Sequence, residues 1–230
     1  MTDWDEMADW WVEEVGDPAY AEEVVPLALD LLDPTPGQRL LDVGCGEGQV
    51  LRAVADRGAD VVGVDGSHAL ARRAGRAVVD RLPDLAAIGD ATVDGAFVIL
   101  VLEHVPDPAP VFGALARVVR PGGHLAVVAN HPVFTAPDGA PVTDPTDGEV
   151  FWRPGRYLDD GHTDEPAGEG TLRFHHRPMG HLLTVAADAG WSLERLIERG
   201  AGPGQVRRDP TLAGQVHIPR LLGARWGRIG

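Results

Sequence analysis

The sequence contains no lysine and only one cysteine. All 20 basic residues among the 230 are arginine, so Schiff-base catalysis and the nucleotide-binding P-loop, which both require a lysine, are excluded. Because Cys45 is alone, an intrachain disulfide and a cysteine zinc cluster are excluded as well.

Long apolar runs and a basic surface are also missing. No apolar stretch approaches the roughly 18 residues of a membrane-spanning helix, and the acidic start lacks the basic and apolar parts of a signal peptide. The 35 acidic residues give a net charge of −15, which repels a nucleic-acid backbone. We therefore expect a soluble, cytoplasmic protein that binds neither membrane nor nucleic acid.

The middle of the chain alternates between apolar runs and helical periodicity. Apolar runs at 39–43 and 61–65 flank a helical pattern at 49–57, which is typical of a βαβ unit. This alternation predicts an α/β fold with a doubly wound, Rossmann-like sheet. The further predicted elements are a helix at 67–81, a weak strand at 86–88, a strand at 97–102, a helix at 108–119 and a strand at 124–129.

The two ends of the chain carry further elements. Helical spacing predicts two N-terminal helices, at 7–15 and 20–32. Regular patterning is lost over 132–170, which is typical of a lid or an insertion. A helix at 178–189 and strands at 191–197 and 216–222 follow, and the two strands suggest a closing hairpin.

A glycine-rich turn lies between the first predicted strand and its helix. Glycines in Leu41–Gly48 let the backbone turn sharply and let a ligand lie against the main chain. A dinucleotide fingerprint needs another glycine at position 49, which is glutamine here. Asp65 ends the next strand, where an acid accepts hydrogen bonds from a ribose diol. Together these features predict an adenosine-bearing cofactor other than NAD.

Four segments in order resemble the motifs of class I S-adenosylmethionine-dependent methyltransferases, in the small-molecule branch that includes ubiquinone-type enzymes. They are Leu41–Gly48, Val62–Ser67, Val101–Pro106 and Val119–Gly123. The tail is also similar to that branch, at His175–Pro178, Ala189–Trp191, Glu198 and Pro219. The resemblance implies a seven-stranded sheet with its last strand antiparallel, and S-adenosyl-L-methionine as the cofactor.

The resemblance also implies cofactor-binding roles for particular residues. The turn would carry the methionine end of the cofactor, the next strand end would hold the ribose, and an acid in a Gly-Asp-Ala run would accept from the adenine amino group. The residues so assigned are Asp42, Gly44, Cys45, Gly46, Gly48, Asp65, Gly66, Ser67, Asp90, Ala91, Leu102 and Glu103.

Catalysis of methyl transfer rests mainly on alignment, which supplies roughly 7–11 kcal/mol, and a base is needed only where the acceptor must lose a proton. His104 and His131 follow predicted strands, whose ends face the ligand crevice of such sheets, and imidazole titrates near neutral pH. Both are candidate bases, with a structural or cofactor-side role open for His104 and an ordinary loop role open for His131.

Candidate acceptor contacts come from the N-terminus and the end of the lid. They are Trp11, Tyr20, His175, His176 and Arg177. The acidic stretch at 159–165 fits no standard calcium or zinc loop, so no metal is predicted.

The sequence thus predicts methyl transfer from S-adenosylmethionine to a small organic acceptor, at oxygen, within one domain. Its expected parts are a helical cap (1–36), a cofactor-binding core (37–131), a lid or insertion (132–177), and a C-terminal helix with a closing hairpin (178–230). Two alternatives stay open: a non-catalytic domain that binds the cofactor or its demethylated product, and an NAD-type oxidoreductase.

Overall fold

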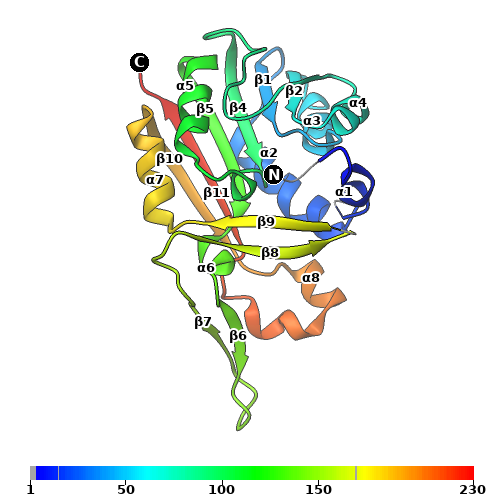
Figure 1. Cartoon of the computed structure of the whole chain (residues 1–230), viewed down its shortest axis with the longest axis vertical. Helices are drawn as coiled ribbons and strands as arrows, with labels where there is room; N and C mark the ends of the chain where they lie inside the picture. The colour runs from blue at the N-terminus through cyan, green and yellow to red at the C-terminus, as the bar shows by residue number, and fades with distance from the viewer. Residues whose placement is uncertain (1–3, 15, 169) are drawn as a thin grey trace.

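The computed structural model describes residues 4–14, 16–168 and 170–230, and it is built around one seven-stranded sheet (Figure 1). Its strand order is β10-β11-β5-β4-β1-β2-β3. Strands β1 to β5 run parallel to one another, whereas β11 is antiparallel to both β5 and β10. The predicted α/β sheet with an antiparallel last strand is therefore confirmed. The strands are β1 (Arg39–Val43), β2 (Asp60–Asp65), β3 (Ala77–Val79), β4 (Val93–Ile99), β5 (Val119–Asn130), β10 (Trp191–Arg199) and β11 (Leu221–Arg228).

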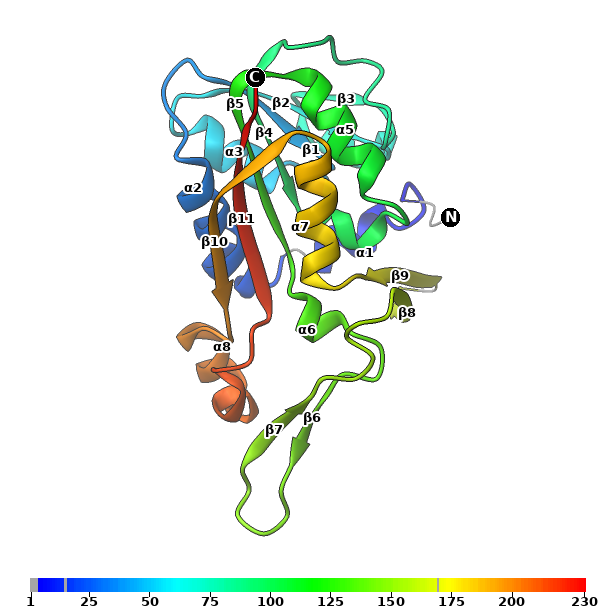
Figure 2. The same cartoon turned by 90° about the vertical axis from the view of Figure 1, so that its left-hand side faces the viewer.

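Helices cover both faces of the sheet (Figure 2). Leu40 and Phe97 pack on the side of α2 and α3, while their neighbours Leu41 and Val98 pack on the side of α5 and α7. Successive strand residues point to opposite faces, so apolar runs without polar alternation bury both faces. The helices are α1 (Ala8–Glu14), α2 (Val25–Leu32), α3 (Gln49–Ala55), α4 (His68–Ala74), α5 (Ala109–Val118), α6 (Pro132–Thr135), α7 (Met179–Asp188) and α8 (Pro203–Arg208).

The third strand differs from the sequence prediction. The helix expected over 67–81 ends at Ala74, because Gly75 takes a positive φ of 79°. The chain then pairs with β2 through β3, which joins Asp65 to Val79 in register. The segment 86–88, predicted as a weak strand, is not in a strand. Two of its three residues are alanine, which has a low strand propensity, whereas β3 carries the β-branched pair Val78 and Val79.

The segment predicted to be irregular contains two hairpins. One is formed by β6 (Ala140–Thr143) and β7 (Val150–Arg153), and it projects from the body of the molecule (Figure 2). The other is formed by β8 (Gly161–Ala167) and β9 (Gly170–His176), and it lies next to α1 (Figure 1).

The connection between the last two strands also differs from the prediction. It contains α8 and a 3-10 helix, Pro210–Gln215, and the last strand begins at Leu221, five residues later than expected.

The parallel strands end at one edge of the sheet, where ligands bind in open α/β folds. Two segments far apart in the sequence lie over this edge. From the N-terminal side, Trp4 contacts His104 with a ring-centroid distance of 5.2 Å, and from the β8–β9 hairpin, Phe174 contacts the same ring at 4.8 Å. No helix among the described residues is long and apolar enough to cross a membrane.

A buried histidine in β5 makes the stability of the fold depend on pH. His124 is 8% exposed, and its Nε2 has no hydrogen-bond partner among the described residues. Burial, assisted by the charge of Arg225, lowers the pKa of His124 to about 4. Below about pH 6.5 the unfolded chain binds a proton at this site that the folded chain does not, so the free energy of unfolding falls as pH falls.

We expect this group to cost about 2 kcal/mol of stability by about pH 5, at roughly 1.36 kcal/mol for each unit of pH. Urea unfolding between about pH 4.5 and 6.5 measures the slope. His124→Gln should flatten it, while His162→Gln, which alters an exposed histidine, should not. Equal slopes in wild type and His124→Gln would show that His124 is not the titrating group.

Candidate active site

The glycine turn is fastened to β2 and closely packed. The backbone N–H groups of Gly44 and Cys45 both donate to the carbonyl oxygen of Val64, at 2.7 and 3.0 Å. Gly44 has a φ of 73°, and a Cβ there would lie 2.5 Å from the Cγ2 of Val101. Only glycine fits this position, because a side chain would be both strained and in collision.

Asp65 joins the turn to the start of α4. Its Oδ2 accepts from the backbone N–H of Gly46, and its Oδ1 accepts from that of Ser67, each at 2.8 Å. Burial raises the pKa of Asp65, whereas these two hydrogen bonds lower it. Ser67 caps α4 by accepting from Leu70 N at 3.1 Å. The carboxylate therefore links Gly46 to Ser67, and these two residues with Gly66 form the rim of the site.

Two buried carboxylates at this edge each keep one oxygen without a partner. Oδ2 of Asp42 and Oε2 of Glu103 make no hydrogen bond to any described residue. Asp42 directly precedes Val43, the last residue of β1, and Glu103 follows β4, the strand beside β1. The other oxygen of Glu103 accepts from the Asn130 amide at 2.9 Å. Unpaired buried carboxylate oxygens are costly, and they suit a positively charged ligand.

The electrostatics of Tyr20 and Asp42 agree with this negative character. Burial raises the pKa of the Tyr20 hydroxyl, and the charges of Asp42, Glu47 and Glu103 raise it further. Burial also raises the pKa of Asp42 well above its usual value, and the charge of Asp65 adds to the effect. A π-helical turn, Tyr20–Val24, begins at this tyrosine.

We therefore expect Asp42 to lower the free energy of unfolding of the ligand-free protein and to favour the binding of a cationic ligand. Asp42→Asn should raise the free energy of unfolding by about 1–2 kcal/mol at neutral pH, since it removes a buried, incompletely paired charge. The pKa of Asp42 in the folded chain lies well above 3.8. The free energy of unfolding of the wild-type chain therefore falls as pH rises from about 3.8 to this raised pKa, whereas that of the variant does not change for this reason.

If Asp42 is the anionic acceptor for the ammonium group of S-adenosylmethionine, as the resemblance implies, the same substitution should weaken binding at least about tenfold. Thermal unfolding and calorimetric titration measure the two effects, with exposed Asp56→Asn as the control. A variant that is destabilised and binds with unchanged affinity would contradict both expectations.

The predictions for Asp90 and Ala91 are wrong. Both precede β4, whereas the glycine turn lies beyond the opposite ends of the strands, and the seven residues of β4 span about 20 Å. Asp90 is exposed and pairs with Arg117 at 2.7 Å. The Gly-Asp-Ala run suggested the motif, but the pairing of the strands places it at the other edge.

Asp80 was not among the cofactor-binding residues expected from the sequence, although it lies at the same edge of the sheet as Asp65. It directly follows β3, and its backbone N–H donates to the carbonyl of Asp65 at 3.1 Å. Its Oδ2 accepts from Ala87 N at 2.7 Å. The sequence does contain a signal for this position, because Asp80 directly follows the short apolar run 77–79. The helix predicted over 67–81 concealed it.

Cys45 contributes its backbone to the turn and its side chain to the core. A Cβ on Gly63 would lie 2.6 Å from the Cys45 sulfur, so the thiol fills the space above β2. Burial raises the pKa of the Cys45 thiol. A buried protonated thiol is a poor nucleophile.

The two candidate bases differ in whether a ring nitrogen is free. His131 is fully buried, its Nδ1 accepts from the backbone of Val133 at 3.1 Å, and its Nε2 therefore donates to Glu198 at 2.7 Å. Burial lowers the pKa of His131, opposed by Glu198. In His104, Nδ1 lies 3.1 Å from the Arg173 carbonyl oxygen, to which it must donate. Nε2 of His104 has no partner among the described residues, so it is the nitrogen available to accept a proton.

The predicted acceptor contacts separate into two groups. Trp11 lies over the turn, with its indole nitrogen 3.2 Å from where a Cβ of Gly46 would be. His176 and Arg177 are buried and engaged by the protein: His176 Nε2 donates to the Tyr157 carbonyl at 2.9 Å, and Arg177 donates to main-chain carbonyls.

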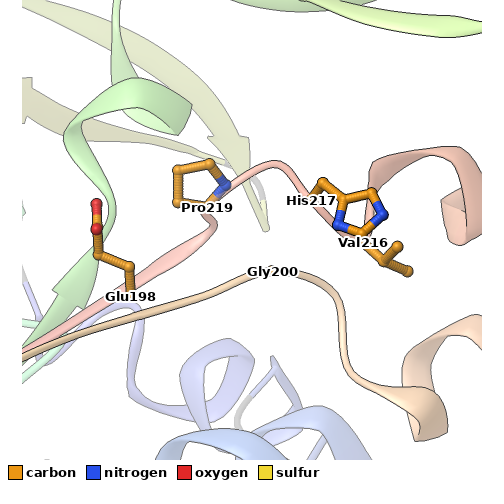
Figure 3. A pocket seen from close by; sticks show the side chains of 5 residues that line it. All are labelled: Glu198, Gly200, Val216, His217 and Pro219. Carbon is orange, nitrogen blue, oxygen red and sulfur yellow. The ribbon is translucent and has the colours of Figure 1, made fainter.

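Two cavities lie at the carboxyl edge of the sheet. The smaller, about 30 Å³, is lined by residues that include Leu102, Glu103, Asn130, His175 and Arg177. The larger, about 260 Å³, lies beside β10 and β11, and Figure 3 shows its lining residues, Glu198, Gly200, Val216, His217 and Pro219. Among the described residues, no three His, Cys, Asp or Glu side chains are grouped to hold a metal ion.

Comparison with known proteins identifies the class. A family model described as a methyltransferase domain matches residues 41–127. The ubiquinone biosynthesis O-methyltransferase of Hahella chejuensis is 40% identical over 130 residues, which are 50% of this chain and 54% of that protein. The chain thus spans about half the length of the curated ubiquinone enzymes that it matches.

Solved structures extend the likeness to almost the whole chain. An S-adenosylmethionine-dependent methyltransferase from Mesorhizobium loti superposes with a TM-score of 0.75 at 26% identity, covering 90% of this chain and 99% of that one. A putative S-adenosylmethionine-dependent methyltransferase from Listeria monocytogenes has the same fold, with a TM-score of 0.75 at 21% identity and coverage of 91% and 99%.

Residues 41–127 match a methyltransferase domain, and the chain has the fold of an S-adenosylmethionine-dependent methyltransferase. The class, the fold and S-adenosylmethionine as the cofactor, all predicted from the sequence, are confirmed.

Proposed function

We propose that this protein transfers a methyl group from S-adenosylmethionine to a hydroxyl oxygen of a small, ring-bearing organic acceptor. The observation that carries the proposal is the pair of buried carboxylates, Asp42 and Glu103, each with an unpaired oxygen at neighbouring strand ends. The methionine end of this cofactor carries an ammonium and a sulfonium, the cationic groups that such oxygens attract. The two carboxylates therefore fit the cofactor.

The other cofactor contacts follow from the geometry of the rim. The main chain of Gly44, Gly46 and Gly48 would lie along the methionine end, and Asp65, with Gly66 and Ser67 beside it, would accept from the ribose hydroxyls. Asp80, one strand further along the edge, replaces Asp90 as the acid near the adenine. Leu102 and Glu103 would border the cofactor from the end of β4.

The aromatic cap supports a ring-bearing acceptor. We define this cap as Trp4, Trp11, His104 and Phe174, whose neighbouring rings lie 4.8–5.6 Å apart. Such a cluster offers apolar faces for stacking and a polar tip for one hydrogen bond. A phenol or another hydroxylated ring is the acceptor chemistry that best matches it. The ubiquinone enzymes that match half of the chain are O-methyltransferases by name.

The mechanism assigns separate tasks to the chain's own residues. When bound, S-adenosylmethionine supplies an electrophilic methyl group on a positively charged sulfur. The glycine turn and Asp65 hold the donor in place, the aromatic cap aligns the acceptor and excludes water, and Nε2 of His104 accepts the hydroxyl proton. Alignment of this kind supplies roughly 7–11 kcal/mol, and proton transfer adds about 10²–10⁴-fold in rate.

A labelled-methyl assay tests the proposal. The protein is incubated with S-adenosylmethionine labelled in its methyl group and with separate panels of phenols, carboxylic acids and primary amines. We expect label in the phenol panel, on oxygen. Label only in amines would overturn oxygen as the methylated atom, and tight cofactor binding with no labelled product in any panel would favour a non-catalytic binding protein.

A further inference from the structure

The turn that carries His104 is held by a buried arginine from a distant part of the chain. Arg177 lies at the junction of β9 and α7 and is 9% exposed. Its Nη1 donates to the carbonyl of Leu102 at 3.0 Å, and its Nη2 donates to the carbonyl of Val105. These two carbonyls flank the Glu103–His104 pair, so one guanidinium closes the turn from both sides.

The side chain of Arg177 has no carboxylate partner among the described residues, although it is charged and buried. Burial lowers the pKa of Arg177, and more distant acids, Asp160 first, oppose the change. Its planar fork of donors matches two carbonyls at once, which a single ammonium does not. Such a costly arrangement indicates that the position of the turn matters.

A second contact from the same hairpin determines the protonation of the imidazole. The carbonyl of Arg173 lies 3.1 Å from Nδ1 of His104, and a carbonyl can only accept. In the neutral ring the proton therefore sits on Nδ1, which leaves Nε2 as the basic atom. Phe174, the next residue, packs against the ring at 4.8 Å.

We propose that Arg177 is a positioning residue: it clamps the 102–105 turn against β9, so that the Arg173 carbonyl holds His104 in the Nδ1–H form with Nε2 presented to the acceptor. The catalytic use of Nε2 in this inference rests on the proposed function, whereas the tautomer of His104 is a property of the ligand-free protein. It replaces the sequence-based expectation that Arg177 contacts the substrate.

Imidazole nitrogen NMR of the ligand-free protein tests this directly. Long-range ¹H–¹⁵N spectra are recorded at a pH where imidazoles are neutral, and His104 is assigned with His104→Gln. We expect wild-type His104 to be protonated at Nδ1. In Arg177→Met we expect that preference to be lost, with a mixture of both tautomers, and in Arg177→Lys we expect it to be partly retained.

Arg173→Met is the matched control. It removes an exposed side chain that pairs with Asp164, yet leaves the accepting carbonyl of Arg173 in place, so His104 should stay in the wild-type form. Thermal unfolding of each variant reports whether it is folded. A wild-type His104 protonated at Nε2, or a folded Arg177→Met that keeps the Nδ1–H form, would overturn the proposal.

Binding of S-adenosylhomocysteine is measured on the same samples, and it separates this inference from the proposed function. Because the clamped turn also carries Glu103, loss of the clamp should lower the affinity, but by less than the roughly 100-fold loss expected for Asp65→Ala. If wild-type protein fails to bind, the proposed function fails and the tautomer result still decides the role of Arg177.

Discussion

Replacing Asp65 by alanine is expected to weaken the binding of S-adenosylhomocysteine by more than about 100-fold. The carboxylate is charged, buried and hydrogen-bonded to the backbone of Gly46 and Ser67, and it is the proposed acceptor for both ribose hydroxyls. Hydrogen bonds to charged groups contribute about 1.5–3 kcal/mol each, and about 1.4 kcal/mol corresponds to tenfold in affinity. Calorimetric titration measures the change.

Two further variants separate binding from folding. Asp65→Asn keeps one accepting oxygen and should lose less affinity than the alanine variant. Asp60→Asn alters an exposed acid at the other end of β2, where it pairs with Arg76, and should bind like wild type. If Asp65→Ala remains folded and binds within threefold of wild type, Asp65 does not belong to the cofactor site.

The largest effect on turnover is expected from His104→Gln. Removing a general base should lower the rate of methyl transfer by about 10²-fold or more, with cofactor affinity unchanged. Glutamine retains a donor for the Arg173 carbonyl, so the turn should keep its shape. Initial rates with an acceptor found in the labelled-methyl panels measure the loss.

His131→Gln provides the comparison, because both ring nitrogens of His131 are engaged within the protein. It should reduce stability and cost less than about tenfold in turnover. The opposite order, with His131→Gln inactive and His104→Gln active, would return the role of base to His131, the other candidate from the sequence.

The features that could be predicted from the sequence are local in the chain. The glycine turn, Asp65 and the βαβ unit are read from neighbouring residues, since strand, turn and helix follow each other within 39–65. The closing hairpin is predicted from two late apolar runs with no full helical pattern between them, and the family resemblance implies that the last strand is antiparallel. The signals for these features lie in short, continuous stretches of the chain.

The features that could not be predicted depend on contacts between distant segments. Asp80 reaches the site only because β3 pairs with β2, and Asp90 is excluded only because β4 starts at the opposite edge. The free nitrogen of His104 and the engaged nitrogens of His131 are set by partners 69 and 67 residues away. The β6–β7 and β8–β9 hairpins were missed for a different reason: β6 and β7 have only four residues each, and β8 is mostly polar, so their periodic signal is weak.

One measurement tests the central claim most directly: calorimetric titration of the full chain with S-adenosylhomocysteine, S-adenosylmethionine and NAD in parallel. The carboxylates at the ends of β1 and β2 and the glycine turn predict binding of the first two at micromolar concentrations, with one molecule bound to each chain, and no binding of NAD. Binding of NAD alone would contradict the account.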